Sequence, residues 1–165
     1  MKRHGTAAAR VACIALVALC VGCAKSSSSN LPPSSPSPTA SVQEQIVQMG
    51  QQVTTAAGNR VTVLSYVAPV TGSAGSGMMF AAADVRACAG PHTTAGRVSR
   101  SQFAAETPDQ TGWAAVAPVK MPALESMVLR PNRCVRGWVT FKVPQSPKAQ
   151  YVVLLSGNVV KWRIP

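Results

Sequence analysis

Acidic side chains are scarce in this chain of 165 residues, which holds five Asp and Glu against sixteen Lys and Arg. Three of the basic residues precede Cys23, so the chain from Cys23 onward has thirteen basic and five acidic residues, a net charge of +8. An excess of this size suits an anionic partner, such as a lipid surface or an acidic polymer. It equally suits an arginine-rich composition without a binding role, because most cations are scattered singly and only Arg130, Arg133 and Arg136 lie close together. Both explanations stay open.

Histidine is scarcer still, since the chain has only His4 and His92. Hydrolysis by a serine or cysteine nucleophile usually needs a histidine base beside it. His92 lies among Gly and Pro, which is typical of a solvated loop. Metal sites need several ligands at compatible spacing, and the acidic residues are dispersed along the chain. No CxxC redox motif is present, so we expect no catalytic residue, no metal site and no cofactor.

A long membrane-spanning run is also missing. The apolar run at residues 11–22 has twelve residues, and a helix rising about 1.5 Å per residue falls well short of a hydrocarbon core of about 30 Å. Basic residues precede the run, and Gly22 places a small residue before Cys23. This order predicts a lipoprotein signal peptide at residues 1–22 and lipidation of Cys23. An ordinary secreted protein and an uncleaved anchor are the alternatives.

Lipidation would place the chain on the outer face of the bacterial cell membrane. A diacylglycerol on Cys23 supplies two acyl chains, which suffice for stable anchoring. The first expected partner is therefore the lipid bilayer. The second is an unidentified envelope protein or an anionic polymer. Nucleic acid is not expected as a partner, because export removes the protein from the cytosol.

Residues 23–57 are predicted to be a linker. Residues 24–41 are rich in Ser and Pro and offer almost no apolar surface to offset chain entropy, which indicates a disordered, semi-rigid tether. Residues 42–57 are rich in Gln, and their apolar residues have a roughly helical spacing that Gly50 interrupts. We interpret them as further linker or a transient helix. The predicted folded domain is then residues 58–165.

Within that domain, short apolar runs alternate with Gly, Pro, Asn and Ser. In residues 134–144, Val and Phe at one parity alternate with Arg, Thr and Lys at the other, which predicts a strand with one buried and one solvated face. Val160 and Trp162 alternate with Lys161 and Arg163 in the same way, and residues 156–158 fit a tight hairpin. Further strands are expected at residues 59–69 and 78–88, with weaker ones between 97 and 129. Seven or eight strands at this spacing predict an all-β fold, an antiparallel β-sandwich.

Cysteine numbers predict one crosslink. Of five cysteines, two lie in the predicted signal peptide and Cys23 is the predicted lipidation site. Cys88 and Cys134 then have one available pairing in an oxidising compartment. Their separation of 46 residues makes such a bond worth about 4 kcal/mol in the chain-entropy model. Two buried free thiols are the alternative.

The chain resembles the immunoglobulin-like lipoproteins of Gram-positive bacteria in four segments. They are the expected strands at residues 59–69, 78–88 and 129–144 and the closing apolar run. The resemblance is most specific over residues 129–144 and closest to the high-GC members. Asn132 stands where the family usually has Gly after Pro131, and Asn tolerates left-handed backbone nearly as well. The resemblance implies an immunoglobulin-like antiparallel β-sandwich on the outer side of the cell membrane, and no particular activity, because this fold carries many functions.

A surface site is the remaining candidate. Trp138 shares its strand parity with Arg136 and Lys142, so this aromatic ring and two cations could stack on a sugar or bind an anionic polymer. The alternative is that a neighbouring loop covers Trp138. If the disulfide joins the two strand ends, Arg86 would lie near Arg136, which is unfavourable unless an anion bridges the pair.

We therefore expect a membrane-anchored, non-enzymatic binding module of the cell envelope. An envelope enzyme or an enzyme inhibitor, whose groups converge only in the fold, is the alternative. A pocket that holds an acid beside His92 would favour that alternative, whereas an exposed patch of Trp and Arg would favour the binding module. A purely structural surface protein is a third reading.

Overall fold

The computed structural model describes residues 43–93 and 96–165. The predicted signal peptide at 1–22, the lipidated Cys23 and the tether at 24–41 lie outside the described residues and stay predictions. Within the described part of the chain, no helix is long and apolar enough to cross a membrane.

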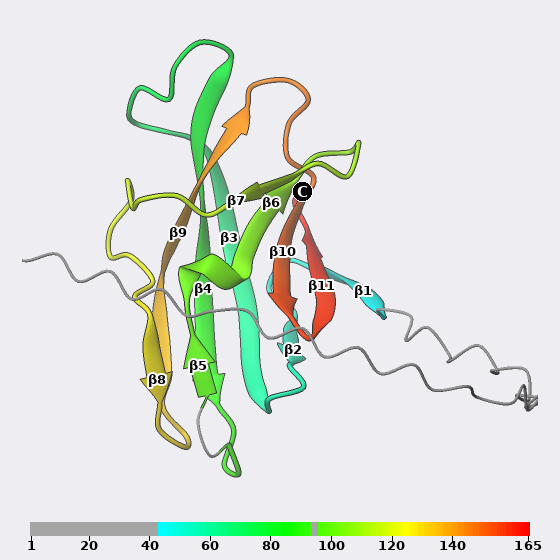
Figure 1. The fold of residues 1–165 in the computed structure, drawn as a ribbon, viewed down its shortest axis with the longest axis vertical. Helices are drawn as coiled ribbons and strands as arrows, with labels where there is room; N and C mark the ends of the chain where they lie inside the picture. Colours follow the sequence, from blue (N-terminus) through cyan, green and yellow to red (C-terminus); the bar gives the residue numbers. More distant parts are fainter. Residues whose placement is uncertain (1–42, 94–95) are drawn as a thin grey trace, which may run out of the picture. The chain divides into compact units, whose positions relative to one another are not determined.

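Two β-sheets pack face to face around one hydrophobic core (Figure 1). The five-stranded sheet contains β1 (Glu44–Gln48), β6 (Phe103–Glu106), β7 (Gly112–Ala114), β10 (Tyr151–Ser156) and β11 (Asn158–Arg163), in the order β1-β11-β10-β6-β7. The four-stranded sheet contains β2 (Gln52–Thr54), β3 (Asn59–Val70), β4 (Met78–Ala89) and β9 (Cys134–Pro144), in the order β2-β3-β4-β9. A short pair, β5 (Gly96–Val98) with β8 (Met127–Leu129), and the 3-10 turn η1 (Arg100–Gln102) complete the described elements. The predicted all-β sandwich is confirmed.

The predicted alternation in the two clearest strands explains how they build the core. In β9, Val139, Phe141 and Val143 are fully buried, while Arg136 and Lys142 on the opposite face are exposed. Side chains at successive positions of a strand point to opposite faces, so one face of β9 meets the core. The other face is solvated at Arg136 and Lys142 but not at Thr140, which is 1% exposed. The segment after β7 covers Thr140, and Val119 N donates a hydrogen bond to its hydroxyl. The tight hairpin between β10 and β11 is also present, with Gly157 in the left-handed region at a φ of 77°.

The predicted linker boundary at Gly58 is wrong, because residues 44–54 form β1 and β2. Val47 faces the core from the five-stranded sheet and Val53 from the four-stranded sheet, each 5% exposed. Gly50, with a φ of 84°, lies in the turn between the two strands. Trp162 Nε1 donates a hydrogen bond of 2.8 Å to the carbonyl of Gln51 and so holds this corner to the core. The apparent helical spacing fails because each strand buries a single Val.

One pair of strands departs from the antiparallel expectation. β1 runs parallel to β11, with Glu44 opposite Val159 and Gln48 opposite Arg163. β1 and β11 lie far apart in sequence, so no tight hairpin constrains their relative direction.

The free edge of β9 is covered by the segment that follows β7. Leu124 N donates to the carbonyl of Trp138, and Trp138 N donates to the carbonyl of Pro122. Leu124 itself is fully buried in the core. Gly137 permits this crossing, because a Cβ at that position would lie 2.5 Å from Leu124 N. The segment protects a long strand from pairing with other chains.

The predicted disulfide is confirmed, and Cys88 and Cys134 are register partners at the ends of β4 and β9. Ala89 N donates to the carbonyl of Arg133 just beyond the bond. Asn132 adopts a φ of 60°, in the left-handed region expected for it.

Candidate functional site

Four basic side chains lie on the outer face of the four-stranded sheet, three of them toward one end. They are Arg60 on β3, Arg86 on β4, and Arg136 and Lys142 on β9, and all four are exposed. Each of the four points away from the core, whereas its neighbours along the strand point toward it. Arg86, for example, lies between Val85 and Ala87, which are both fully buried. We call these four residues the basic face.

The strand register brings three of these arginines close together. Arg86 lies directly opposite Arg136, as the sequence suggested it would if the disulfide joined the two strands. Arg60 lies opposite Cys88, one row along the sheet. Arg60, Arg86 and Arg136 therefore come from three neighbouring strands and flank the disulfide.

One buried carboxylate lies among these cations. Arg136 donates from Nε to Asp84 Oδ1 at 3.1 Å and from Nη2 to Oδ2 at 2.6 Å. This hydrogen-bonded carboxylate raises the pKa of Arg136 above its ordinary value. The Asp84 side chain is 6% exposed and that of Arg136 is 65% exposed. Within the described part of the chain, no carboxylate lies within ion-pair distance of Arg86.

Trp138 is half-buried, and a cation other than the two predicted lies over its ring. Lys120, from the segment that covers the edge of β9, places Nζ 4.5 Å from the ring centroid. Trp138 and Arg136 line one surface pocket of about 350 Å³ together with Asp84 and Pro122. Lys142 does not line it, since it pairs with Phe80 farther along β9. Arg136, Trp138 and Lys142 share the outer face of β9 as predicted, Lys120 covers Trp138 in part, and joint binding by the three side chains stays a prediction.

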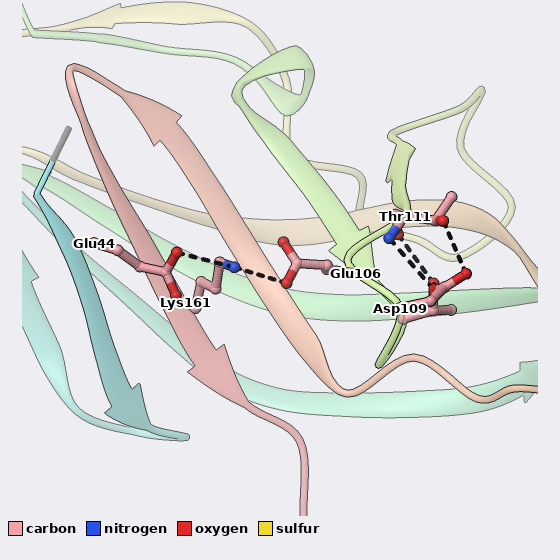
Figure 2. Close-up of polar contacts among 6 residues, drawn as sticks. Glu44, Glu106, Asp109, Thr111 and Lys161 are labelled. Atoms are coloured by element: carbon pink, nitrogen blue, oxygen red, sulfur yellow. Dashed lines mark hydrogen bonds and ion pairs between the residues drawn. The ribbon is translucent and has the colours of Figure 1, made fainter. Parts of the chain in front are cut away.

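The five-stranded sheet is balanced in charge instead. Its strands carry Glu44, Glu106, Lys161 and Arg163. Lys161 Nζ lies 2.7 Å from Glu106 Oε1 and 3.2 Å from Glu44 Oε2, between the two carboxylates (Figure 2). This corrects the expectation that Lys161 is solvated, because it is 8% exposed.

The environment of Lys161 favours its charged form. Burial alone would lower the pKa of this ammonium, but the hydrogen bonds to Glu106 and Glu44 outweigh burial and raise the pKa above its ordinary value. Tyr151 adds an aromatic face, with its ring centroid 5.8 Å from Lys161 Nζ. The cluster joins β1, β6 and β11, so it ties the edge of the five-stranded sheet together.

The arrangement that would have favoured an enzyme is not seen around His92. This residue is exposed in a turn, and it lines a hollow with residues 56–58 and 90–93, none of which is acidic. Across residues 43–93 and 96–165, no three His, Cys, Asp or Glu side chains are grouped as metal ligands.

Comparison with solved structures finds this fold in two other proteins of extracytoplasmic description. The secreted protein MPT63 from Mycobacterium tuberculosis matches with a TM-score of 0.58 and 16% identity, over 74% of this chain and 99% of that one. YcdA from Bacillus subtilis, described as a candidate lipoprotein, matches with a TM-score of 0.53 and 14% identity, over 72% of this chain and 38% of that one. No family model and no curated protein sequence matches this chain. The likeness shows a shared fold, and the resemblance to immunoglobulin-like lipoproteins stays a resemblance.

Sequence reasoning missed Asp84 and Lys120. A signal for Asp84 was present, because it has the same strand parity as Arg86 and the register places it opposite Trp138. No comparable signal existed for Lys120, whose position depends on how the segment after β7 crosses the edge of β9.

Proposed function

We propose that this chain is a lipid-anchored, extracytoplasmic, non-catalytic binding module that holds an anionic polymer of the cell envelope on its basic face. Cys23 would carry the anchor, and residues 24–41 would space the sandwich from the membrane. The shared fold of MPT63, described as secreted, and of YcdA, described as a candidate lipoprotein, supports a position outside the cytoplasm.

The separation of charge between the two sheets carries the proposal. The strands of the four-stranded sheet hold four exposed cations and one carboxylate, which is buried. The strands of the five-stranded sheet hold two cations and two carboxylates. If the basic composition had no binding role, exposed cations would be expected on the outer faces of both sheets. Their excess on one sheet therefore favours an anionic partner for the basic face.

The spacing of the arginines suits a polymer better than a single small anion. Arg86 and Arg136 are direct register partners, and like charges in this position repel. Arg60 lies one row away, at a distance that successive phosphate or carboxylate groups of a chain could match. Guanidinium groups bind such oxyanions through paired N–H donors.

Binding to immobilised polyphosphate, measured at several salt concentrations, tests the proposal. We expect Arg86→Glu to weaken binding about tenfold or more, and added salt to weaken binding of the unmodified protein. Arg163→Glu, on the five-stranded sheet, is the matched control because it changes net charge equally, and it should weaken binding about twofold or less. Equal losses in the two variants would overturn the basic face as the binding site.

The anchor is tested separately by the intact mass of the protein in the membrane fraction of the native host. We expect a mature N-terminus at Cys23 carrying diacylglycerol, and release into the medium or retention of the signal peptide after Cys23→Ala. An unlipidated protein in the medium without any substitution would overturn the anchor and leave the basic face to be judged by its own assay.

A further inference from the structure

Three turns lie together at one end of the sandwich. They are residues 55–58 between β2 and β3, 90–93 after β4, and 130–133 between β8 and β9. Thr93 Oγ1 donates a hydrogen bond to the carbonyl of Gly58, and Ala89 N donates one to the carbonyl of Arg133, so each turn is held to a neighbour. These turns are at the bottom of Figure 1, and we call this part of the molecule the turn end.

The described chain enters the sandwich at the turn end. β1 begins at Glu44, which lies opposite Val159, the second residue of β11. The hairpin just before Val159 reaches the turn end, since a Cβ at Gly157 would lie 3.6 Å from the Ala56 side chain. The proposed tether precedes β1 in the sequence and would therefore join the sandwich here. A membrane that held Cys23 would face this end more readily than the opposite one.

Exposed arginines surround an exposed valine at the turn end. Val128 of β8 is 63% exposed, and Arg97 of β5 is its register partner, so the two side chains share one face of this two-stranded ribbon. Arg130 and Arg133 follow in the next turn, which a hydrogen bond of 3.0 Å from Arg133 N to the carbonyl of Arg130 closes. Both line one surface hollow of about 570 Å³ with Met127 and Val128. We call Arg97, Val128, Arg130 and Arg133 the ribbon tip.

No described carboxylate neutralises the cations of the ribbon tip. The ion pairs within residues 43–93 and 96–165 include none of Arg97, Arg130 and Arg133. The three turns of the turn end contain no Asp or Glu. Glu125 is the acidic residue nearest to β8 in sequence, and it precedes the strand at the end away from the turn. An anionic surface would therefore meet three arginines that no carboxylate neutralises, and each contact would favour binding.

The exposed valine distinguishes a membrane from a dissolved anionic partner. A polymer of phosphates or carboxylates would satisfy the arginines, but it would gain nothing from Val128. A bilayer with anionic head groups offers both kinds of contact, because phosphates lie at its surface and the acyl boundary beneath them accepts apolar side chains. The entry of the chain at the same end favours the bilayer further.

We propose that the ribbon tip docks the sandwich onto an anionic lipid bilayer, with Val128 at the acyl boundary and the three arginines against lipid phosphates. A phosphate in the hollow between Arg130 and Arg133 would accept paired N–H donors from either guanidinium group. The choice of a bilayer rests in part on the proposed anchor. The residues of the ribbon tip are distinct from those of the basic face, whose orientation toward the membrane docking would set.

Sedimentation with lipid vesicles tests the docking separately from the anchor. Residues 39–165 form one compact unit, so a chain that begins at Ala24 keeps this unit whole and lacks the predicted lipidation site. We expect it to bind vesicles of equimolar phosphatidylglycerol and phosphatidylcholine, and to bind phosphatidylcholine vesicles about tenfold more weakly or less. The mass of the native protein judges the anchor, whereas this assay judges the docking.

Two pairs of variants separate the apolar contribution from the charged one. Val128→Thr keeps a β-branched side chain and should weaken vesicle binding about threefold. Its control, Leu155→Thr, changes an apolar residue that is 55% exposed on the five-stranded sheet, and it should leave binding unchanged. Arg133→Gln should weaken binding about fivefold, whereas Arg163→Gln, at the far end of β11, should weaken it less than about twofold.

Absence of binding to the anionic vesicles would overturn the proposal. Equal effects of Val128→Thr and Leu155→Thr would also overturn it, because they would indicate adsorption by charge alone. The remaining occupant is a second copy of the chain. If Val128→Thr reduced self-association in sedimentation of the protein alone and left vesicle binding unchanged, the ribbon tip would be a contact between copies, and docking to a bilayer would be wrong.

Discussion

Arg86 and Arg136 lie directly opposite each other on β4 and β9, and of the two Arg136 has a carboxylate, Asp84, within ion-pair distance. Opposed like charges on neighbouring strands cost up to about 1 kcal/mol. Asp84 lies one row along the same face of the sheet, is almost inaccessible to solvent, and offsets part of that cost. Arg86 has no carboxylate within ion-pair distance in the described part of the chain.

Replacing Asp84 should therefore have opposite effects on stability and on binding. We expect Asp84→Ala to lower the free energy of unfolding by about 1–2 kcal/mol, a modest loss because Arg136 is largely exposed. The same variant should bind polyphosphate about twofold to fivefold more tightly, since Arg136 is no longer neutralised. Urea denaturation and the polyphosphate assay measure the two effects. Unchanged or weaker binding would contradict a role for Arg136 in anion recognition.

Gly137 is expected to be the most sensitive position on β9. A Cβ there would lie 2.5 Å from Leu124 N and 2.6 Å from the carbonyl carbon of Ala123, and both atoms belong to backbone. Gly137→Ala should push this segment off the edge and partly withdraw Leu124 from the core, at a cost of about 2–5 kcal/mol in thermal or urea unfolding. Gly112→Ala on β7 is the control, because nothing lies within 4 Å of a Cβ at that position. Similar losses in both variants would contradict this account.

Lys161 should stabilise the fold over a defined pH range. Its pKa is raised in the folded protein, so its contribution is fully present below the ordinary Lys value of 10.5 and is lost as the pH rises through the folded value. Lys161→Met would leave Glu44 and Glu106 without their cation, and we expect a loss of about 1–3 kcal/mol at neutral pH. Urea unfolding of both proteins, measured from neutral pH to above 10.5, should show that their difference in free energy of unfolding becomes smaller as the pH rises. A constant difference would contradict the ion pairs as its cause.

Asp109 should act at the opposite end of the pH scale. Hydrogen bonds from the Thr107 and Thr111 side chains lower its pKa below the ordinary value of 3.8, and the contact with Thr111 is visible in Figure 2. A lowered folded pKa gives stability that is present above 3.8 and is lost as the pH falls through the folded value. Asp109→Ala should thus be less stable than the unmodified protein at neutral pH. In strong acid, the stabilities of Asp109→Ala and of the unmodified protein should become equal. Thermal unfolding of both proteins at neutral pH and in strong acid measures this.

Much of the fold follows from local sequence patterns. The bounds of β9 agree with the predicted strand at 134–144, and the hairpin of β10 and β11 was indicated by its alternation and by Gly157. These strands were predictable because each carries several apolar residues at one parity. β1 and β2 were not, because each is short and buries one Val, so their pairing with distant strands is what identifies them.

Some residues of the candidate site could also be predicted from the sequence, and others could not. Arg136 and Trp138 could be assigned to the outer face from strand parity alone, whereas Lys120 reaches Trp138 from a segment with no regular pattern. The ribbon tip likewise depends on residues that the sequence separates widely, since Arg97 of β5 meets Val128 of β8.

The sequence by itself predicts the export signal, and it determined the strand-rich class and the one available pairing of Cys88 with Cys134, because each depends on composition, short-range periodicity or a count. Only the tertiary structure decided which charges are neutralised and which remain available. Asp84 reaches Arg136 across 52 residues of sequence, and Lys161 reaches Glu106 across 55. Charge interactions depend on distance in space and on burial, and strand register, which no local pattern encodes, sets both.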